Sequence, residues 1–228
     1  LSAIPAGQDP LSYTRDWLSD KVFPEVDLTK PVEEEEVEKA IKSLSITDAA
    51  GHDHITTRVV KCMGSYIAPI LTHLINLCFE HDRMPTVFKL AKISPLYKSG
   101  DKFNARNYRP VAVLPALSKV IERVVFSRLK SHLETYNLLT DTQNAYREKR
   151  SVTTAMLQLY DEIMAKQDEG IDSACVFLDC SAAFDTIQHS VLMEKLKLYG
   201  ASAKSLAWFK DYLTDRAQYV SIGGTRSE

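Results

Sequence analysis

The 228-residue sequence lacks the features of a membrane or secreted protein. It contains no run of about 18 apolar residues, so we expect no transmembrane helix, and no signal-peptide pattern at its start. It also lacks internal repeats and low-complexity tracts. Its composition, 45% hydrophobic and 25% charged, is ordinary for a folded globular protein. The first residue is Leu1 rather than methionine, so we expect a piece excised from a longer chain.

Clusters of metal-binding side chains are also lacking. The four cysteines form no Cys-x-x-Cys pair, and no histidine cluster stands near them at the spacing of a zinc finger. We interpret them as reduced thiols of the core in a reducing compartment. Four of the histidines are too scattered to indicate a metal site. The residues concerned are Cys62, Cys78, Cys175 and Cys180, with His52, His54, His73 and His81.

Charge is distributed unevenly along the chain. Residues 1–60 hold 6 Lys and Arg against 12 Asp and Glu, a net charge of −6. Residues 89–150 hold 13 against 5, a net charge of +8. A basic block in an acidic chain suggests a surface for a polyanion. A solvated face whose charges balance elsewhere is an equally open interpretation.

Apolar periodicity predicts a mostly helical chain with a few strands, of the α+β class. A proline-containing extended arm is expected over residues 1–30. Ser151 is expected to cap one of the helices and Gly170 to end it. The strand at 173–179 is apolar on both faces, so we expect it to be central and covered. Helices are expected at 32–45, 55–63, 66–83, 116–135, 152–168, 189–200 and 202–215, a β-hairpin at 91–114, and strands at 173–179 and 216–224.

A carboxylate, Asp179, stands at the end of that apolar strand in the stretch FLDCSAAFDTI. A carboxylate at a strand end is a hard oxygen ligand, and Mg²⁺ is typically held by one or two carboxylates together with substrate phosphates. The alternative is structural, because Asp179 or Ser181 can also cap a helix that follows.

The whole pattern resembles the reverse transcriptases of non-LTR retrotransposons of the LINE and jockey type. FLDCSAAFDTI is similar to their first palm motif. KLAKISPLYKSGDKFNARNYRPVAVLPALSKVIERVVFSRL and LLTDTQNAYREKRSVTTAML are similar to their two fingers blocks. KSLSITDAAGHDHITTRVVK and HDRMP resemble the segment before the fingers. The resemblance implies an N-terminal arm and helical extension at 1–60, fingers at 61–170 with a β-hairpin, and the first part of a palm sheet at 171–228.

The resemblance also assigns roles in the palm motif. Asp179 matches the metal-binding aspartate, and the carbonyl of Cys180 would help to hold the metal, Mg²⁺. Ser181, Ala182 and Ala183 would run beneath the incoming triphosphate. Phe184 would lie against the sugar and leave no room for a 2′-hydroxyl, which would favour deoxynucleotides.

In the fingers, Lys98 and Arg109 are expected to face each other across the hairpin and match residues that grip the triphosphate. Gln143, Arg147, Lys149 and Arg150 resemble the stretch that contacts the template. For all six, an exposed surface residue or a solvated loop is the alternative. The partners implied are an RNA template, a DNA primer and a dNTP, in a protein acting in the cytoplasm and the nucleus and not at a membrane.

The resemblance is incomplete, because the chain contains no aromatic-Ala-Asp-Asp motif. One aspartate cannot hold both ions of a two-metal site, so we expect this chain alone to be inactive as a polymerase. A non-catalytic module that binds nucleic acid or protein, or an interaction protein of unrelated function, is the alternative. An open sheet edge at 173–179 or 217–222 would also favour self-association.

Overall fold

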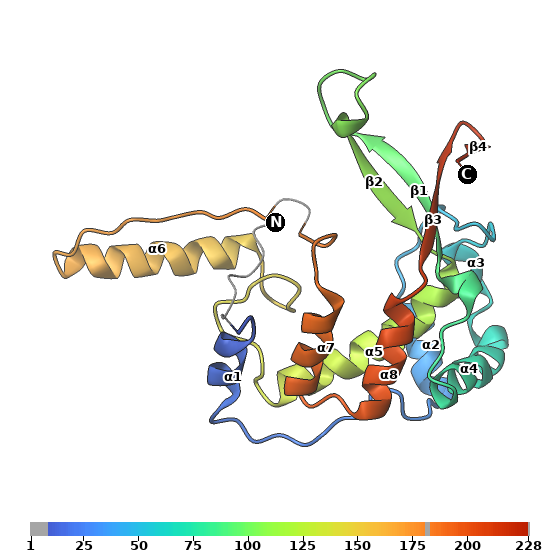
Figure 1. The fold of residues 1–228 in the computed structure, drawn as a ribbon, viewed down its shortest axis with the longest axis horizontal. Helices are drawn as coiled ribbons and strands as arrows, with labels where there is room; N and C mark the ends of the chain where they lie inside the picture. The colour runs from blue at the N-terminus through green and yellow to red at the C-terminus, as the bar shows by residue number, and fades with distance from the viewer. Residues whose placement is uncertain (1–8, 181–182, 228) are drawn as a thin grey trace.

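The structure of the protein, a computed structural model, describes residues 9–180 and 183–227. A helical body carries a β-hairpin, and a long helix, α6, extends away from the body on another side (Figure 1). The α-helices are α1 (Ser12–Leu18), α2 (Glu34–Ser43), α3 (Thr57–Cys62), α4 (Gly64–Glu80), α5 (Ala116–Thr135), α6 (Val152–Asp168), α7 (His189–Leu198) and α8 (Ala203–Leu213). The strands are β1 (Leu90–Tyr97), β2 (Tyr108–Val113), β3 (Ala217–Ile222) and β4 (Thr225–Arg226), and the 3-10 helices are η1 (Thr86–Phe88) and η2 (Ala105–Asn107). The predicted α+β class is confirmed.

Local sequence signals place most helices where we predicted them. In α2, Glu34–Glu36 occupy the first turn, where the helix dipole favours negative charge. Ser151 caps α6 through a capping box, in which the N–H of Thr154 donates to Ser151 Oγ at 3.2 Å and the N–H of Ser151 donates to Thr154 Oγ1 at 2.8 Å. Gly170, at φ +72°, follows the end of α6, as expected. Among the described residues, no helix is both long and apolar enough to cross a membrane.

Helices α2, α4, α5 and α8 share one hydrophobic core. Trp208 of α8 lies edge-on to Phe79 of α4, with ring centroids 5.8 Å apart, and stacks on Tyr212 at 5.2 Å. The largest buried side chains of this core are Val37, Ile41, Val60, Leu71, Ile75, Phe79, Val120, Ile121, Val124 and Trp208. The core therefore joins residues on both sides of position 170, although the expected domain boundaries stay predictions.

The N-terminal arm is only partly extended. Its residues 1–8 lie outside the described part of the chain. Helix α1 was not predicted, because its buried stripe of Leu11, Thr14 and Leu18 is short and includes a polar residue. From residue 19 to α2 the chain is mostly extended, and it lies on the helical body (Figure 1). The N–H of Leu28 donates to Ser205 Oγ at 2.8 Å, so α8 contributes to its position.

The sheet has the order β2-β1-β3-β4. The predicted hairpin is confirmed: β1 and β2 pair antiparallel, with Leu96 opposite Arg109. Strand β3, predicted at 216–224, pairs parallel to β1, with Leu90 opposite Ala217. Strand β3 therefore extends the sheet of the β1–β2 hairpin.

The expected palm strand at 173–179 is wrong. These residues form no strand and are exposed, with the side chains of Val176, Phe177 and Leu178 at 83%, 79% and 90% exposure. A strand needs a neighbouring backbone to satisfy its N–H and C=O groups. No described strand lies beside 173–179, since β3 pairs with β1 instead.

The cysteine prediction is half right. All four cysteines are free, as expected, but only Cys78 is buried, and its burial raises the pKa of its thiol to about 11. Cys62, Cys175 and Cys180 are exposed, the last two because they belong to the segment that forms no strand.

Candidate nucleotide and nucleic-acid interface

The β1–β2 hairpin brings Lys98 and Arg109 to one of its faces. The N–H of Lys98 donates to the carbonyl of Asn107 at 2.8 Å, while Arg109 stands opposite Leu96. We expected the two cations to face each other directly across the hairpin, and this prediction is wrong, because Arg109 stands opposite Leu96. They are diagonal neighbours, because side chains alternate along a strand and Lys98 shares a face with Leu96 and Arg109.

Both hairpin cations are available for a ligand. Lys98 and Arg109 are exposed, and in the described part of the chain neither side chain makes a hydrogen bond or an ion pair. The hairpin itself stands clear of the helical body (Figure 1). Two unpaired cations on one face of a projecting hairpin suit a ligand with several phosphate groups.

The loop before α6 carries the second set of expected cations, and the structure divides that set in two. Arg147 Nη1 donates to the carbonyl of Thr140 at 2.9 Å, and Arg150 forms an ion pair with Asp141, with Nη2 and Oδ1 3.3 Å apart. These two arginines therefore stabilise the loop itself. Gln143 and Lys149 are exposed, and within the described residues their side chains have no partner.

A residue that sequence reasoning missed attaches this loop to α5. Lys130 Nζ lies 2.6 Å from Glu148 Oε1, and this hydrogen bond, with the charge of Lys130, lowers the pKa of the Glu148 carboxyl. Lys130 and Glu148 are 18 positions apart along the chain, so no periodic sequence pattern predicts this ion pair.

Phe184 meets the same loop. Its ring lies edge-on to the ring of Tyr146, with centroids 6.5 Å apart and an angle of 80° between the planes. Tyr146 adopts φ +59°, a left-handed conformation that is uncommon outside glycine. The loop and the palm motif, which the sequence places about 40 residues apart, are thus brought together, while Ser181 and Ala182 lie outside the described residues.

Asp179 and Cys180 are exposed in the extended segment after α6, and Ala183 is exposed beyond them. In the described ranges, no group of three or more His, Cys, Asp or Glu side chains is arranged to hold a metal ion. A lone exposed carboxylate does not fit the two-metal site of a polymerase. The described residues of this chain therefore do not form a two-metal site by themselves.

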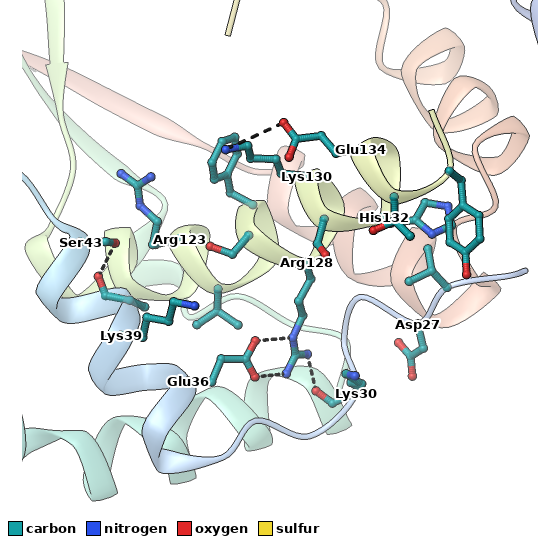
Figure 2. Close-up of a pocket in the computed structure, with 18 of the residues that line it drawn as sticks. Asp27, Lys30, Glu36, Lys39, Ser43, Arg123, Arg128, Lys130, His132 and Glu134 are labelled. Carbon is teal, nitrogen blue, oxygen red and sulfur yellow. Dashed lines mark hydrogen bonds and ion pairs between the residues drawn. The ribbon is translucent and has the colours of Figure 1, made fainter. Parts of the chain in front are cut away.

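A cavity of about 790 Å³ lies elsewhere, between the N-terminal arm, α2 and α5. Figure 2 shows Arg128 reaching from α5 across this space to Glu36 of α2 and to the carbonyl of Lys30. Its charged lining is balanced and consists of Lys30, Lys39, Arg123, Arg128 and Lys130 with Glu25, Asp27, Glu36, Glu134 and Glu148. None of the expected site residues lines it, so we interpret it as a structural gap bridged by ion pairs.

Comparison with known proteins is consistent with the sequence motifs. Residues 97–227 match the family "Reverse transcriptase (RNA-dependent DNA polymerase)". The chain is 29% identical over 200 residues to the probable RNA-directed DNA polymerase from transposon BS of Drosophila melanogaster, which covers 87% of this chain and 22% of that protein. It is 28% identical over 212 residues to the probable RNA-directed DNA polymerase from transposon X-element of the same organism, covering 92% and 23%.

A third relative is the RNA-directed DNA polymerase from mobile element jockey of Drosophila melanogaster, 25% identical over 194 residues, with 85% of this chain and 21% of that protein covered. The chain thus spans less than a quarter of the length of these curated relatives. Because the family match extends over more than half of the chain, from the hairpin to β4, the protein belongs to the reverse transcriptase (RNA-dependent DNA polymerase) family and is similar to its non-LTR retrotransposon members.

Proposed function

We propose that this chain is the nucleotide- and template-gripping part of an RNA-directed DNA polymerase that copies the RNA of a non-LTR retrotransposon. The observation that carries the proposal is the pair Lys98 and Arg109, exposed and unpaired within the described residues on one face of the hairpin. Phosphoryl transfer depends mainly on positioning the phosphates and neutralising their charge. A dNTP is the ligand that this pair suits, with Mg²⁺ as its counter-ion.

Titration of a fluorescent dNTP with Mg²⁺ into the chain tests the hairpin. We expect Lys98→Ala and Arg109→Ala each to weaken binding by about tenfold, the effect of losing roughly 1.4 kcal/mol of a charge-assisted contact. Lys204→Ala is the matched control, because Lys204 is an exposed lysine at the start of α8. Equal weakening by the control, or none by the hairpin variants, would refute the assignment.

The loop before α6 is proposed to hold the template strand of an RNA–DNA primer–template. Fluorescence anisotropy across a salt series tests this, because phosphate contacts weaken as salt rises. We expect Lys149→Ala to reduce the salt slope by about one, without the loosening of the loop that Arg147→Ala and Arg150→Ala would cause. An absence of binding by the wild type at low salt would contradict the proposal.

The chain alone is proposed to be inactive as a polymerase. Asp179 is a single carboxylate, and the sequence has no aromatic-Ala-Asp-Asp motif to supply the other acids. Primer extension with purified chain, primer–template, dNTPs and Mg²⁺ should give no product, and robust metal-dependent extension would overturn this. In the longer protein, Asp179→Asn should abolish extension while leaving primer–template binding intact.

A second candidate function is a non-catalytic module that binds nucleic acid or a protein. The observation in its favour is that residues 173–180, Asp179 included, are exposed and belong to no sheet. Under this alternative the cations matter and Asp179 does not. Extension by the longer protein that survives Asp179→Asn, or a longer protein with no extension at all, would favour the module.

Phe184 is proposed to select the sugar of the incoming nucleotide. In the longer protein, Phe184→Ala should raise the incorporation of ribonucleotides, because the ring would no longer exclude a 2′-hydroxyl. Tyr146→Ala serves as a companion variant, since the Tyr146 ring lies edge-on to Phe184. Unchanged sugar selectivity of Phe184→Ala would contradict the role.

Two further proposals concern assembly and location. The apolar residues 174–178 are exposed and unpaired within the described part of the chain, which favours self-association through this segment. Light scattering that shows a strict monomer at high concentration would argue against it.

The longer protein is proposed to act at nuclear DNA after synthesis in the cytoplasm, as its similarity to retrotransposon polymerases suggests, and cell fractionation would test that.

A further inference from the structure

Helix α4 is largely apolar on its outer face as well as on its inner face. Its first 16 residues include no Asp, Glu, Lys or Arg. Its inner face belongs to the hydrophobic core through Leu71, Ile75 and Phe79. A helix that is apolar all round is normally covered on all sides, yet α4 lies at the outer edge of the helical body (Figure 1). Its outer face therefore has no covering element among the described residues.

Four side chains form a stripe along this outer face, which we call the α4 stripe. Tyr66 is 82% exposed, Ile70 67% and Leu77 38%. His73 is also exposed. Successive residues of an α-helix are rotated by about 100°, so spacings of four, three and four residues place these side chains within an arc of about 60°. The four side chains therefore share one face of the helix.

The α4 stripe is the same from either end. Its spacings of four, three and four residues do not change when the helix is followed in the opposite direction. If two copies of α4 lie antiparallel, Tyr66 stands opposite Leu77 of the second copy, and Ile70 stands opposite its His73. A two-fold interface needs such a self-complementary surface, because the same patch serves both subunits.

The charges at the ends of α4 also favour an antiparallel neighbour. Glu80, the last residue of α4, is exposed and follows Leu77 by three positions, so it continues the stripe. A carboxylate at this end is unfavourable, because the helix dipole favours negative charge at the N-terminus. Within the described structure, that N-terminus has no acidic residue in its first turn and no side-chain cap. An antiparallel second copy places each Glu80 near the N-terminus of the other α4, where the dipole favours it.

A groove of about 610 Å³ lies beside Leu77. Its lining runs from the last turns of α4 to the start of η1 and consists of Leu74, Leu77, Cys78, His81, Arg83, Met84, Pro85 and Thr86. In the antiparallel arrangement, Tyr66 of the second copy stands opposite Leu77 and thus at this groove. A tyrosine suits it, because the ring is apolar and the hydroxyl can reach a polar partner such as Arg83.

We propose that the α4 stripe binds a second copy of this chain in an antiparallel, two-fold arrangement, with Tyr66 of each copy in the groove beside Leu77 of the other. The symmetric spacing, the unfavourable position of Glu80 and the groove all point to this occupant. An apolar helix of another protein would account only for the uncharged stripe. This interface is independent of the proposed function and does not involve residues 174–178.

Sedimentation equilibrium of the 228-residue chain over a concentration series tests the interface. We expect a monomer–dimer equilibrium in which Ile70→Asp raises the dissociation constant at least about tenfold, because it brings two carboxylates together at the centre of the interface. Val22→Asp is the matched control, since Val22 is 96% exposed on the N-terminal arm, and it should dimerise as the wild type does. A wild type that stays monomeric throughout the series would refute the proposal. Dimerisation that Leu178→Asp abolishes and Ile70→Asp leaves intact would also refute it.

Disulfide cross-linking tests the antiparallel register without adding a charge. The exposed Cys62, Cys175 and Cys180 are first replaced by serine. A mixture of Tyr66→Cys and Leu77→Cys chains should then form a linked dimer, whereas either variant alone should not, because its two copies of the cysteine would lie roughly 16 Å apart along the paired helices. Cross-linking of Tyr66→Cys alone as efficient as that of the mixture would overturn the antiparallel arrangement. Overlapping thermal unfolding curves of the variants in dilute solution would exclude a folding defect.

Discussion

At the scale of single residues, Arg128 connects segments that are far apart in the sequence. Its guanidinium donates to both carboxylate oxygens of Glu36, at 2.7 and 2.6 Å, and to the carbonyls of Leu28, Lys30 and Pro31. The Arg128 side chain is only 8% exposed. One side chain on α5 therefore holds the N-terminal arm and α2 together.

Replacing Arg128 by alanine should lower the free energy of unfolding by about 3 kcal/mol, because Glu36 and the carbonyls lose a buried partner. Urea denaturation followed by circular dichroism measures this. Arg58→Ala is the control, since the Arg58–Asp48 pair is exposed and should contribute little. If the urea denaturation curve of Arg128→Ala overlaps the curve of the wild type, the role of this side chain is contradicted.

The ion pair between Lys89 and Asp211 makes stability depend on pH. Burial acts to raise the pKa of Asp211, but hydrogen bonds from Lys89 Nζ at 2.8 Å and from the N–H of Met84 at 2.7 Å outweigh it and hold this pKa below its ordinary value of 3.8. A carboxyl with a lowered pKa in the folded state stabilises the fold above the ordinary pKa. That stability is lost as the pH falls below 3.8 through the folded-state value.

Asp211→Asn should therefore destabilise the protein at pH 7 by about 3 kcal/mol, because Lys89 is almost fully buried and loses its counter-charge. The difference between variant and wild type should shrink as the pH falls below 3.8, where the carboxyl of the unfolded chain is protonated first and that of the folded protein only at lower pH. Denaturation curves measured at intervals of about half a pH unit between about pH 2.5 and 7 give this comparison. A difference that stays constant with pH would show that the charge of Asp211 is not what matters.

At the scale of whole elements, α5 and α6 are helices of similar length in very different surroundings. Helix α5 has seven buried residues, whereas α6 has none in the described structure, and its apolar Val152, Met156, Leu157 and Tyr160 are exposed. Most helical stability in proteins comes from packing rather than from propensity. Helix α6 should therefore open more readily than α5.

Hydrogen exchange followed by mass spectrometry tests this difference. Peptides from α6 should exchange much faster than peptides from α5, because local opening of an unpacked helix costs little free energy. The measurement at low protein concentration is the reference. Protection of α6 that rises with concentration would reveal a second copy covering it, and equal protection of both helices in a monomer would contradict the expectation.

At the scale of the whole molecule, the C-terminal part of the chain completes both the hydrophobic core and the sheet. Trp208 of α8 lies in the hydrophobic core, against Phe79 of α4, and β3 pairs with the edge of β1. The core and the sheet thus both depend on residues beyond 171. A protein cut after Gly170 would expose the apolar surface that Trp208 covers and would leave β1 with a free edge.

We expect a chain ending at Gly170 to lose its cooperative unfolding transition. In the full chain, Trp208→Ala should cost about 3–5 kcal/mol, the range for removing a large buried aromatic side chain. Thermal unfolding measured by calorimetry tests both changes. A cooperative transition in the shortened chain would show that residues 1–170 fold without the C-terminal part, as the expected domain boundary at 170 implies.

The helices and the hairpin were predictable because their signals are local. The apolar stripe of α5, the cap at Ser151 and the polar loop between β1 and β2 each involve residues within one element or its ends. The family was likewise evident from short motifs around Lys98, Gln143 and Asp179. Helix α1 was missed, since its buried stripe is only two turns long.

Long-range pairing was decided by the tertiary structure alone. The segment SACVFLD has the composition of a buried strand, but composition does not supply a neighbour, and β3 pairs with β1 rather than with it. The diagonal placement of Lys98 and Arg109, the contact of Tyr146 with Phe184 and the anchoring of the loop by Lys130 also depend on register and packing. The sequence by itself determined the family and the local elements, because these depend on residues close together in the chain. Which cations and rings stand free for a ligand depends on contacts between distant residues, and only the folded structure sets those.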